Sequence, residues 1–161
     1  MKVPERYKAA GNSIGGGMIR EQNQDRVACM RFCSRLNDVA PFVVIALSDG
    51  MGGMKDGAEC ASRTVAGFFD SIVRNRHLDE VSRISLAAEE ANESVYRFAG
   101  GYGGATLSAV LVSELGAFIV NVGDSRIYAE VQASGVQLRR LTIDDSLAEI
   151  VGGNGRDLLQ Y

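Results

Sequence analysis

The sequence predicts an α+β fold built on antiparallel sheet. Two observations support this prediction: apolar residues alternate as in strands at both ends of the patterned region, and two helical stripes follow one another between them. Strands grouped apart from helices are typical of α+β proteins, whereas a parallel sheet needs strands and helices in alternation. The length of 161 residues suits one domain, which we expect to occupy 1–161.

Two strands are expected before the helices. Residues 26–33 alternate in polarity, and residues 41–48 form a β-branched run that is apolar on both faces. A run of the second kind is typical of a strand buried between layers. It ends abruptly at Asp49 and Gly50.

Two helices are expected next, over 57–76 and 80–99. In the second, apolar residues recur three and four positions apart, as on one face of an amphipathic helix. The expected buried stripe consists of Val81, Ile84, Ala88, Ala91, Val95 and Phe98. The expected solvent face consists of Glu80, Arg83, Glu89, Glu90 and Glu93. Because the stripe is under three heptads long, it favours packing on a sheet over a coiled coil.

After the helices the pattern returns to strands, which we expect to form a meander. Four alternating runs are separated by glycine-containing segments at hairpin spacing. The expected strands are 105–112, 117–122, 126–131 and 136–141.

Charge and hydropathy exclude two classes of partner. The chain has 17 basic and 20 acidic side chains, so it lacks the basic field that binding to nucleic acid or anionic membranes requires. Its longest apolar run, 41–47, is far below the roughly 20 residues of a membrane helix. No apolar segment follows the N-terminal charges as in a signal peptide. These features predict a cytoplasmic protein without nucleic-acid or membrane partners.

The cysteines raise one catalytic alternative. Cys29 and Arg35 have the spacing by which cysteine-dependent phosphatases place a thiolate beneath a phosphate-binding loop. Such a loop needs small residues, so that successive backbone N–H groups point inward. The residues around Cys29 alternate as in a strand instead, which favours a structural role for this cysteine.

Acidic residues beside glycines follow two of the expected strands. Asp49 ends an apolar strand, where a bound cation would neutralise a carboxylate at the rim of the core, and Gly50 lets the backbone approach that ion. The alternative is that Asp49 and Gly50 simply form a turn, which is the commonest role of this dipeptide. The segment from Gly123 to Arg126 leaves the same two interpretations open.

Five segments in a fixed order carry a family resemblance. They are Arg20 with Asn23-Gln24-Asp25, Asp49-Gly-Met-Gly-Gly53, Gly104-Ala-Thr106, Gly123-Asp-Ser-Arg126 and Leu141-Thr-Ile-Asp-Asp-Ser146. Together they resemble the motifs of metal-dependent serine/threonine phosphatases of the 2C type, over about 11–147. Met51 stands where many eukaryotic members have a histidine, as in the bacterial-like branch. The resemblance implies a four-layer α-β-β-α sandwich with two antiparallel sheets and a metal centre at one end.

The resemblance also implies roles for particular residues. Asp49 matches the carboxylate that bridges two metals and is central to catalysis, and Gly50 matches a residue whose carbonyl binds the second metal. Asp25 matches an acid near that second metal, and Asp124 one at a third, weaker metal site. Arg20 matches the guanidinium that binds the substrate phosphate, a task suited to its planar fork.

The implied activity is hydrolysis of phosphoserine and phosphothreonine in proteins by a metal-activated water, with two or three Mn²⁺ or Mg²⁺ ions as cofactors. The implied partners are phosphorylated substrates of a serine/threonine kinase. The family has further metal-binding aspartates in a later Asp-Gly and Asp-Asn, and neither dipeptide occurs after Arg126. We therefore expect the C-terminal part of the fold to be missing from these residues. The alternative is a catalytically deficient regulatory or phosphoprotein-binding module.

Overall fold

The expected strands and helices are all present in the computed structural model, which describes residues 8–12, 23–34, 39–51, 56–132 and 135–146. The elements are β1 (Asp25–Phe32), β2 (Phe42–Asp49), α1 (Gly57–Arg74), α2 (Glu80–Ala99), β3 (Leu107–Ser113), β4 (Gly116–Val122), β5 (Tyr128–Gln132) and β6 (Val136–Arg140). Their ends agree with the sequence prediction to within two residues.

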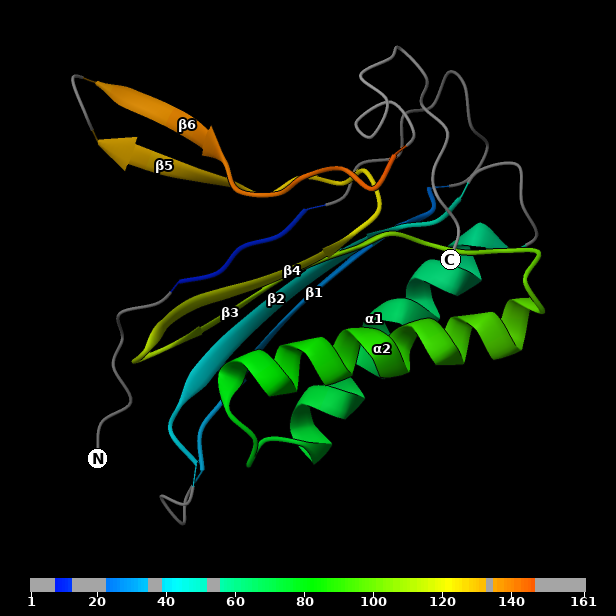
Figure 1. The fold of residues 1–161 in the computed structure, drawn as a ribbon, viewed down its shortest axis with the longest axis horizontal. Helices are drawn as coiled ribbons and strands as arrows, with labels where there is room; N and C mark the ends of the chain where they lie inside the picture. The colour runs from blue at the N-terminus through cyan, green and yellow to red at the C-terminus, as the bar shows by residue number, and fades with distance from the viewer. Residues whose placement is uncertain (1–7, 13–22, 35–38, 52–55, 133–134, 147–161) are drawn as a thin grey trace.

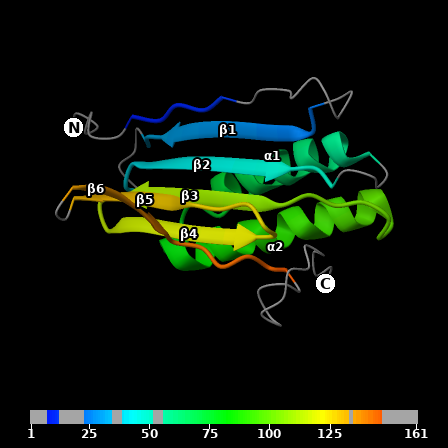
Figure 2. The same ribbon diagram turned by 90° about the horizontal axis from the view of Figure 1, so that it is seen from above.

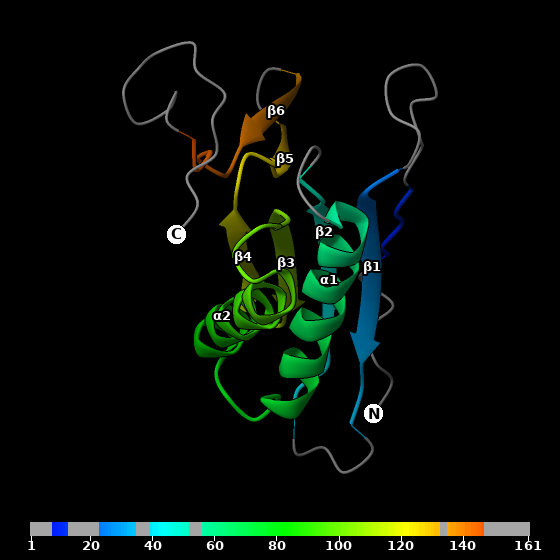
Figure 3. The same ribbon diagram turned by 90° about the vertical axis from the view of Figure 1, so that its right-hand side faces the viewer.

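The main sheet has four antiparallel strands in the order β1-β2-β3-β4. Both helices lie against one face of it, α1 along β1 and β2, and α2 along β3 and β4 (Figures 1 and 3). The β-branched run of β2 is thus central in the sheet, as its apolar character predicts.

The last two strands form a separate sheet. β5 pairs only with β6 among the described strands, and this hairpin lies on the face of the main sheet opposite the helices (Figures 1 and 2). The predicted meander is therefore interrupted between β4 and β5. The α+β class and the two antiparallel sheets are confirmed.

The core lies between the main sheet and the helices. Alternate residues of β2 point toward the helices, so Phe42, Val44 and Ala46 are almost fully buried while Leu47 is 38% exposed. The helices contribute Phe68, Ile72, Ile84, Ala87 and Ala91 to this core, and β3 contributes Leu107, Ala109 and Leu111. The intervening residues of the strands, Asp49 among them, point toward the β5–β6 side.

The buried face of α2 differs from the predicted stripe at its ends. Val81 is 58% exposed and Phe98 is 38% exposed, whereas Ala87 is fully buried. Ile84, Ala91 and Val95 are buried as expected, and Ala88 packs against the core. The face that meets the sheet and α1 is therefore turned slightly from the one that the apolar spacing indicates.

Two charged residues predicted on the solvent face of α2 are buried. Arg83 is only 5% exposed because its guanidinium lies over the ring of Phe42, at 4.6 Å from the centroid, and its Nη2 donates to the carbonyl of Leu78 at 2.7 Å. Glu80, at 9% exposure, lies one turn before it. An arginine can cover apolar surface with its stem and ring-stacking head, so charge alone misassigned this position.

Within the described ranges, no helix is long and apolar enough to span a membrane.

Candidate active site

One end of the main sheet collects the sequence-predicted acids. Because neighbouring strands are antiparallel, β1 begins, β2 ends, β3 begins and β4 ends at the same end of the sheet. Asp25 is the first residue of β1 and Asp49 the last of β2. The segments that precede β3 and follow β4 contain Thr106 and Asp124, so four of the five motifs meet here.

Asp25 and Asp49 are directly opposite each other in the β1–β2 ladder. Register partners place their side chains on the same face of a sheet, about 5 Å apart at Cβ. Both residues are partly buried, and like charges in this position repel each other. The pairing therefore brings the oxygens of two carboxylates to one position at the sheet end, where one cation could bind both.

Gly50 lies against the N-terminus of α1. A Cβ on Gly50 would come within 2.2 Å of the Gly57 carbonyl oxygen, so no other residue fits without moving the helix. The Gly50 amide donates to the Gln24 carbonyl at 3.3 Å, and Gly50 forms a bridge with Ala105. Since β2 leads into a helix here, Asp49 and Gly50 do not form a hairpin turn.

Gln24 belongs to the first of the five motifs, but sequence reasoning assigned it no role of its own. Its side-chain oxygen is buried and has no hydrogen-bond partner in the described part of the chain. It lies beside Gly57, where an added Cβ would come within 2.9 Å of it. A buried amide oxygen without a donor is suited to a cation or a cation-bound water. Its place in the polar segment before Asp25 was the available signal.

The backbone around Asp25 is held by side chains of its own segment. The Asp25 amide donates to Asn23 Oδ1 at 2.8 Å, and Arg26 Nη1 donates to the carbonyls of Asn23 and Asp25 at 3.2 and 2.8 Å. Arg26 Nε also donates to Ser62 Oγ of α1 at 2.9 Å. Arg26 thereby connects the strand start to the helix, a role that its position in an alternating strand does not reveal.

Thr106 holds the backbone of Asp49 on both sides. Its amide donates to the Asp49 carbonyl at 2.8 Å, and its hydroxyl accepts the Asp49 amide hydrogen at 3.0 Å. The same hydroxyl shares a hydrogen bond of 2.9 Å with Ser125 Oγ. Thr106 is 4% exposed, and both hydrogen bonds of its hydroxyl are partly buried.

The loop that carries Asp124 is attached to the residues after β6. The Gly123 amide donates to Asp145 Oδ2 at 3.0 Å, and the Asp145 amide donates to the Gly123 carbonyl at 2.9 Å. Asp124 itself is exposed. Because β4 and β5 belong to different sheets, this loop is not a hairpin turn either.

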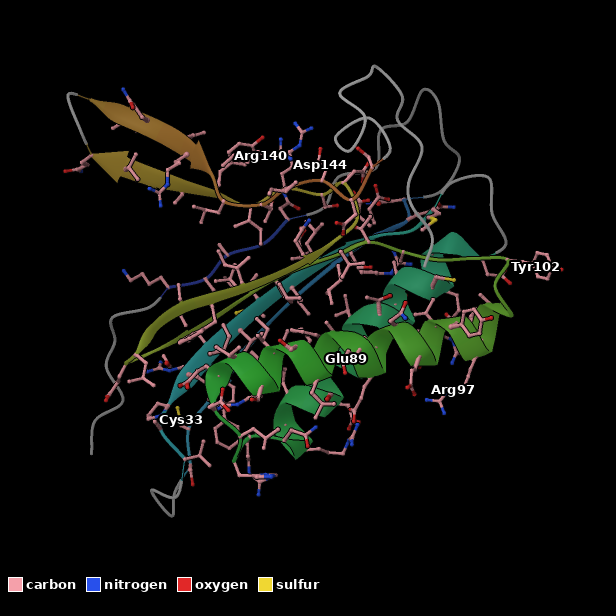
Figure 4. The ribbon with its side chains drawn as sticks, viewed as in Figure 1. Cys33, Glu89, Arg97, Tyr102, Arg140 and Asp144 are labelled. Atoms are coloured by element: carbon pink, nitrogen blue, oxygen red, sulfur yellow. The ribbon has the colours of Figure 1, made fainter. Side chains whose placement is uncertain are left out.

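Asp144 anchors the same region through two arginines. Arg126 Nε donates to both carboxylate oxygens, at 3.1 and 3.0 Å, and Arg126 Nη2 and Arg140 Nη2 each donate at 2.6 Å. Figure 4 shows Arg140 and Asp144 close together above the main sheet. The hydrogen bonds from Arg126 and the charge of Arg140 hold the pKa of Asp144 below its ordinary value, against its burial. The same pairing raises the pKa of Arg126.

The donor chemistry at the sheet end fits a hard divalent cation. Carboxylates of Asp25 and Asp49, the backbone at Gly50 and the amide oxygen of Gln24 are all oxygen ligands, which Mg²⁺ and Mn²⁺ prefer. In the described ranges, no three His, Cys, Asp or Glu side chains lie close enough together to form a metal-binding group. Arg20, the predicted phosphate ligand, lies outside the described residues.

Cys29 is confirmed as a strand residue. It lies within β1, opposite Ile45 of β2, in regular antiparallel pairing. An extended, paired strand turns successive amides to opposite sides, so it does not form a phosphate-binding loop. The structure thus excludes a cradle built on the residues that follow Cys29 within β1.

Solved structures with the same fold include serine/threonine phosphatases. The PPM Ser-Thr phosphatase MsPP from Mycobacterium smegmatis, in complex with cacodylate, is 26% identical with a TM-score of 0.61, over 82% of this chain and 51% of that one. The S. agalactiae serine/threonine phosphatase is 27% identical with a TM-score of 0.59, over 83% and 54%. The catalytic domain of the phosphatase PstP, in complex with two manganese ions, is 22% identical with a TM-score of 0.62, over 84% and 55%.

Sequence comparison adds nothing to these structures, because neither a family model nor a curated protein matches the chain. The chain spans about half the length of the three phosphatases. The structural match to each of them covers 82–84% of this chain. The resemblance to the 2C-type family is confirmed: the chain has the fold of the PPM-type serine/threonine phosphatases over about half of their length.

Proposed function

We propose that the chain contributes the metal-binding end of a phosphatase that hydrolyses phosphoserine and phosphothreonine in proteins. Asp25, Asp49 and the carbonyl of Gly50 would hold Mn²⁺ or Mg²⁺, with Asp49 between two ions. Asp124 would serve a third, weaker site, and Arg20 would bind the substrate phosphate. The substrates would be proteins phosphorylated by a serine/threonine kinase. The protein would act in the cytoplasm, as expected from the sequence.

The observation that carries this proposal is the pairing of Asp25 with Asp49 in the β1–β2 register. Two carboxylates at opposed positions destabilise a strand pair by repulsion. The sheet nevertheless places both on the face away from the core and packs the N-terminus of α1 against Gly50. A cation between the two carboxylates would offset their mutual repulsion. The two manganese ions in the PstP complex support the choice of metal.

When bound, such ions lower the pKa of a coordinated water and neutralise phosphoryl oxygens. The residues of this chain would then hold the ions and orient the phosphate, and no side-chain nucleophile is needed. That agrees with the strand position of Cys29, and it gives Arg20 a phosphate-binding role.

The test is Mn²⁺-dependent hydrolysis of a phosphothreonine peptide by the protein expressed from the complete reading frame. We expect Asp49→Asn, which keeps the shape and removes the charge, to lower kcat/KM by about a hundredfold or more, since it removes a metal ligand. Glu89→Gln is the matched control, because it removes a carboxylate charge at an exposed position of α2 that is not among the candidate site residues (Figure 4). Equal rates for wild type and Asp49→Asn would overturn the metal assignment.

The alternative, a catalytically deficient module with the same fold, predicts a different outcome in the same protein. It would show no Mn²⁺-dependent turnover, and calorimetry would detect little or no heat of Mn²⁺ binding. Turnover that depends on Mn²⁺ and is lost in Asp49→Asn would exclude this alternative.

A further inference from the structure

Two hydroxyl groups connect the two acidic segments of the candidate site. Thr106 Oγ1 accepts the amide hydrogen of Asp49 at 3.0 Å and lies 2.9 Å from Ser125 Oγ. Ser125 is the neighbour of Asp124 in sequence. A chain of two hydrogen bonds thus runs from the end of β2 to the loop after β4, although these segments are far apart along the chain.

Thr106 and the loop that carries Ser125 are in close contact. Thr106 is 4% exposed, and a Cβ on Gly123 would come within 2.7 Å of its methyl group. Gly123 also has φ of +101°, a conformation that other residues rarely adopt. Its conformation and lack of a side chain let the loop approach Thr106 closely enough for the two hydroxyls to meet.

The other side of the loop is fixed as well. Asp145 accepts from the Gly123 amide and donates to its carbonyl, and Asn121 Nδ2 donates to that carbonyl at 3.3 Å. Since the loop is held between Thr106 and the residues after β6, the Ser125 hydroxyl is its hydrogen-bonded connection toward Asp49.

We propose that Thr106 and Ser125 are positioning residues whose paired hydroxyls set the separation between Asp49 and Asp124. The inference rests on the proposed function for its consequence, which is the affinity of the sheet end for Mn²⁺. Neither hydroxyl is among the proposed metal or phosphate ligands. Each acts through the backbone of the acid beside it, so loss of either one misplaces a carboxylate without removing it.

The first experiment measures Mn²⁺ binding by calorimetry in the complete protein. Thr106→Val and Ser125→Ala should each lower the affinity about five- to tenfold, the equivalent of one buried hydrogen bond. The double variant should lose no more than the larger single loss, because both changes break the same connection. Thr106→Ser, which keeps the hydroxyl, should bind within about twofold of wild type.

Thr64→Val is the matched control. Thr64 is 5% exposed, and its hydroxyl donates to the Cys60 carbonyl within α1, outside the connection. This variant removes a buried threonine hydroxyl with the same loss of chemistry, so its Mn²⁺ affinity should equal that of wild type. If Thr64→Val loses as much Mn²⁺ affinity as Thr106→Val, the loss reflects general destabilisation and the proposal is overturned. Additive losses in the Thr106→Val, Ser125→Ala double variant would overturn it as well, because the two hydroxyls would then act independently.

The second experiment needs no metal and no activity. Amide hydrogen exchange at Asp49 should become several-fold faster in Ser125→Ala because the Thr106 hydroxyl, which accepts that amide hydrogen, loses its second partner. Unchanged exchange at Asp49 in Ser125→Ala would overturn the connection itself. If wild type binds no Mn²⁺, the proposed function fails, and this exchange measurement alone decides whether the hydroxyl pair couples the two segments.

Discussion

At the scale of single residues, the carboxylate of Asp144 accepts more hydrogen bonds from arginines than that of Asp145, the other acid described after β6. Its carboxylate is 5% exposed and receives hydrogen bonds from Arg126 and Arg140, whose side chains are 46% and 29% exposed. Bonds to a charged partner stabilise more than neutral ones, but exposure of the arginines screens them. The pair joins the β5–β6 hairpin to the loop that carries Asp124.

We expect Asp144→Asn to lower the free energy of unfolding by about 2 kcal/mol at pH 7. Because the folded pKa of Asp144 is lowered, its contribution is complete above the unfolded pKa of about 4 and is lost as the pH falls through the folded value. The difference between wild type and variant in urea denaturation should therefore shrink as the pH falls below about 4. A difference that stays constant from pH 7 to pH 3 would contradict this assignment.

Sequence reasoning identified site residues best where a strand pattern breaks. The break after β2 pointed to Asp49 and Gly50, whereas the role of Asp25 came from the family resemblance. The structure brings Asp25 and Asp49 to one end of the sheet because β1 and β2 are antiparallel. The roles of Thr106 and Asp145 did not follow from the sequence, because each depends on which distant segment lies beside it. Only the register of β2 with β3 brings the Thr106 hydroxyl to the Asp49 amide.

At the scale of elements, periodicity predicted each helix and strand of the described residues but not each buried face. The apolar spacing of α2 placed Val81 inside and Arg83 outside, and both were wrong. The aromatic ring of Phe42 provides a surface on which a guanidinium can be buried, and nothing local to α2 indicates that ring. Facing residues on another element therefore decide burial at a helix end.

Gly50, which follows β2, and Gly67, which lies within α1, provide a test of how α1 packs against its neighbours. Gly50→Ala should destabilise the protein by about 3 kcal/mol, because the new methyl group overlaps the backbone of Gly57 at 2.2 Å. Gly67→Ala should instead stabilise it by about 0.5–1 kcal/mol, because its Cβ would meet Ala91 at an ordinary 3.5 Å and alanine favours helix.

Urea denaturation of both variants measures the two changes in the free energy of unfolding. We expect the free energy of unfolding to fall in Gly50→Ala and to rise in Gly67→Ala. An unchanged value in Gly50→Ala would contradict the close packing of α1 against Gly50. Destabilisation by Gly67→Ala would show that α1 and α2 approach more closely than the structure has them.

At the scale of the whole molecule, the two sheets differ greatly in burial. β5 and β6 form a two-stranded ribbon on which Val136 and Leu138 are 70% and 72% exposed, whereas Val44 and Ala109 of the main sheet are at most 1% exposed. An isolated ribbon is only marginally stable in water. The sequence pattern of the last strands did not distinguish this arrangement from one continuous meander, since alternation is the same in both.

We expect the hydrogen-bonded amides of β5 and β6 to exchange at least about tenfold faster than those of β2 and β3 in this chain, because the hairpin opens without disrupting the core. Native-state hydrogen exchange resolves the two sheets by residue. Uniform protection across both sheets would mean that the hairpin unfolds only together with the core.

The contact between Asp49 and Thr106 has a consequence for how the protein is made. These residues are 57 positions apart, with both helices between them. Pairings of such separation form late, because a long loop must close before they gain any stability. A nascent chain that has completed β1, β2 and both helices already carries Asp25 and Asp49, but it lacks the Thr106 hydrogen bonds that hold the Asp49 backbone. We expect those bonds to form only when β3 has left the ribosome and joined the sheet.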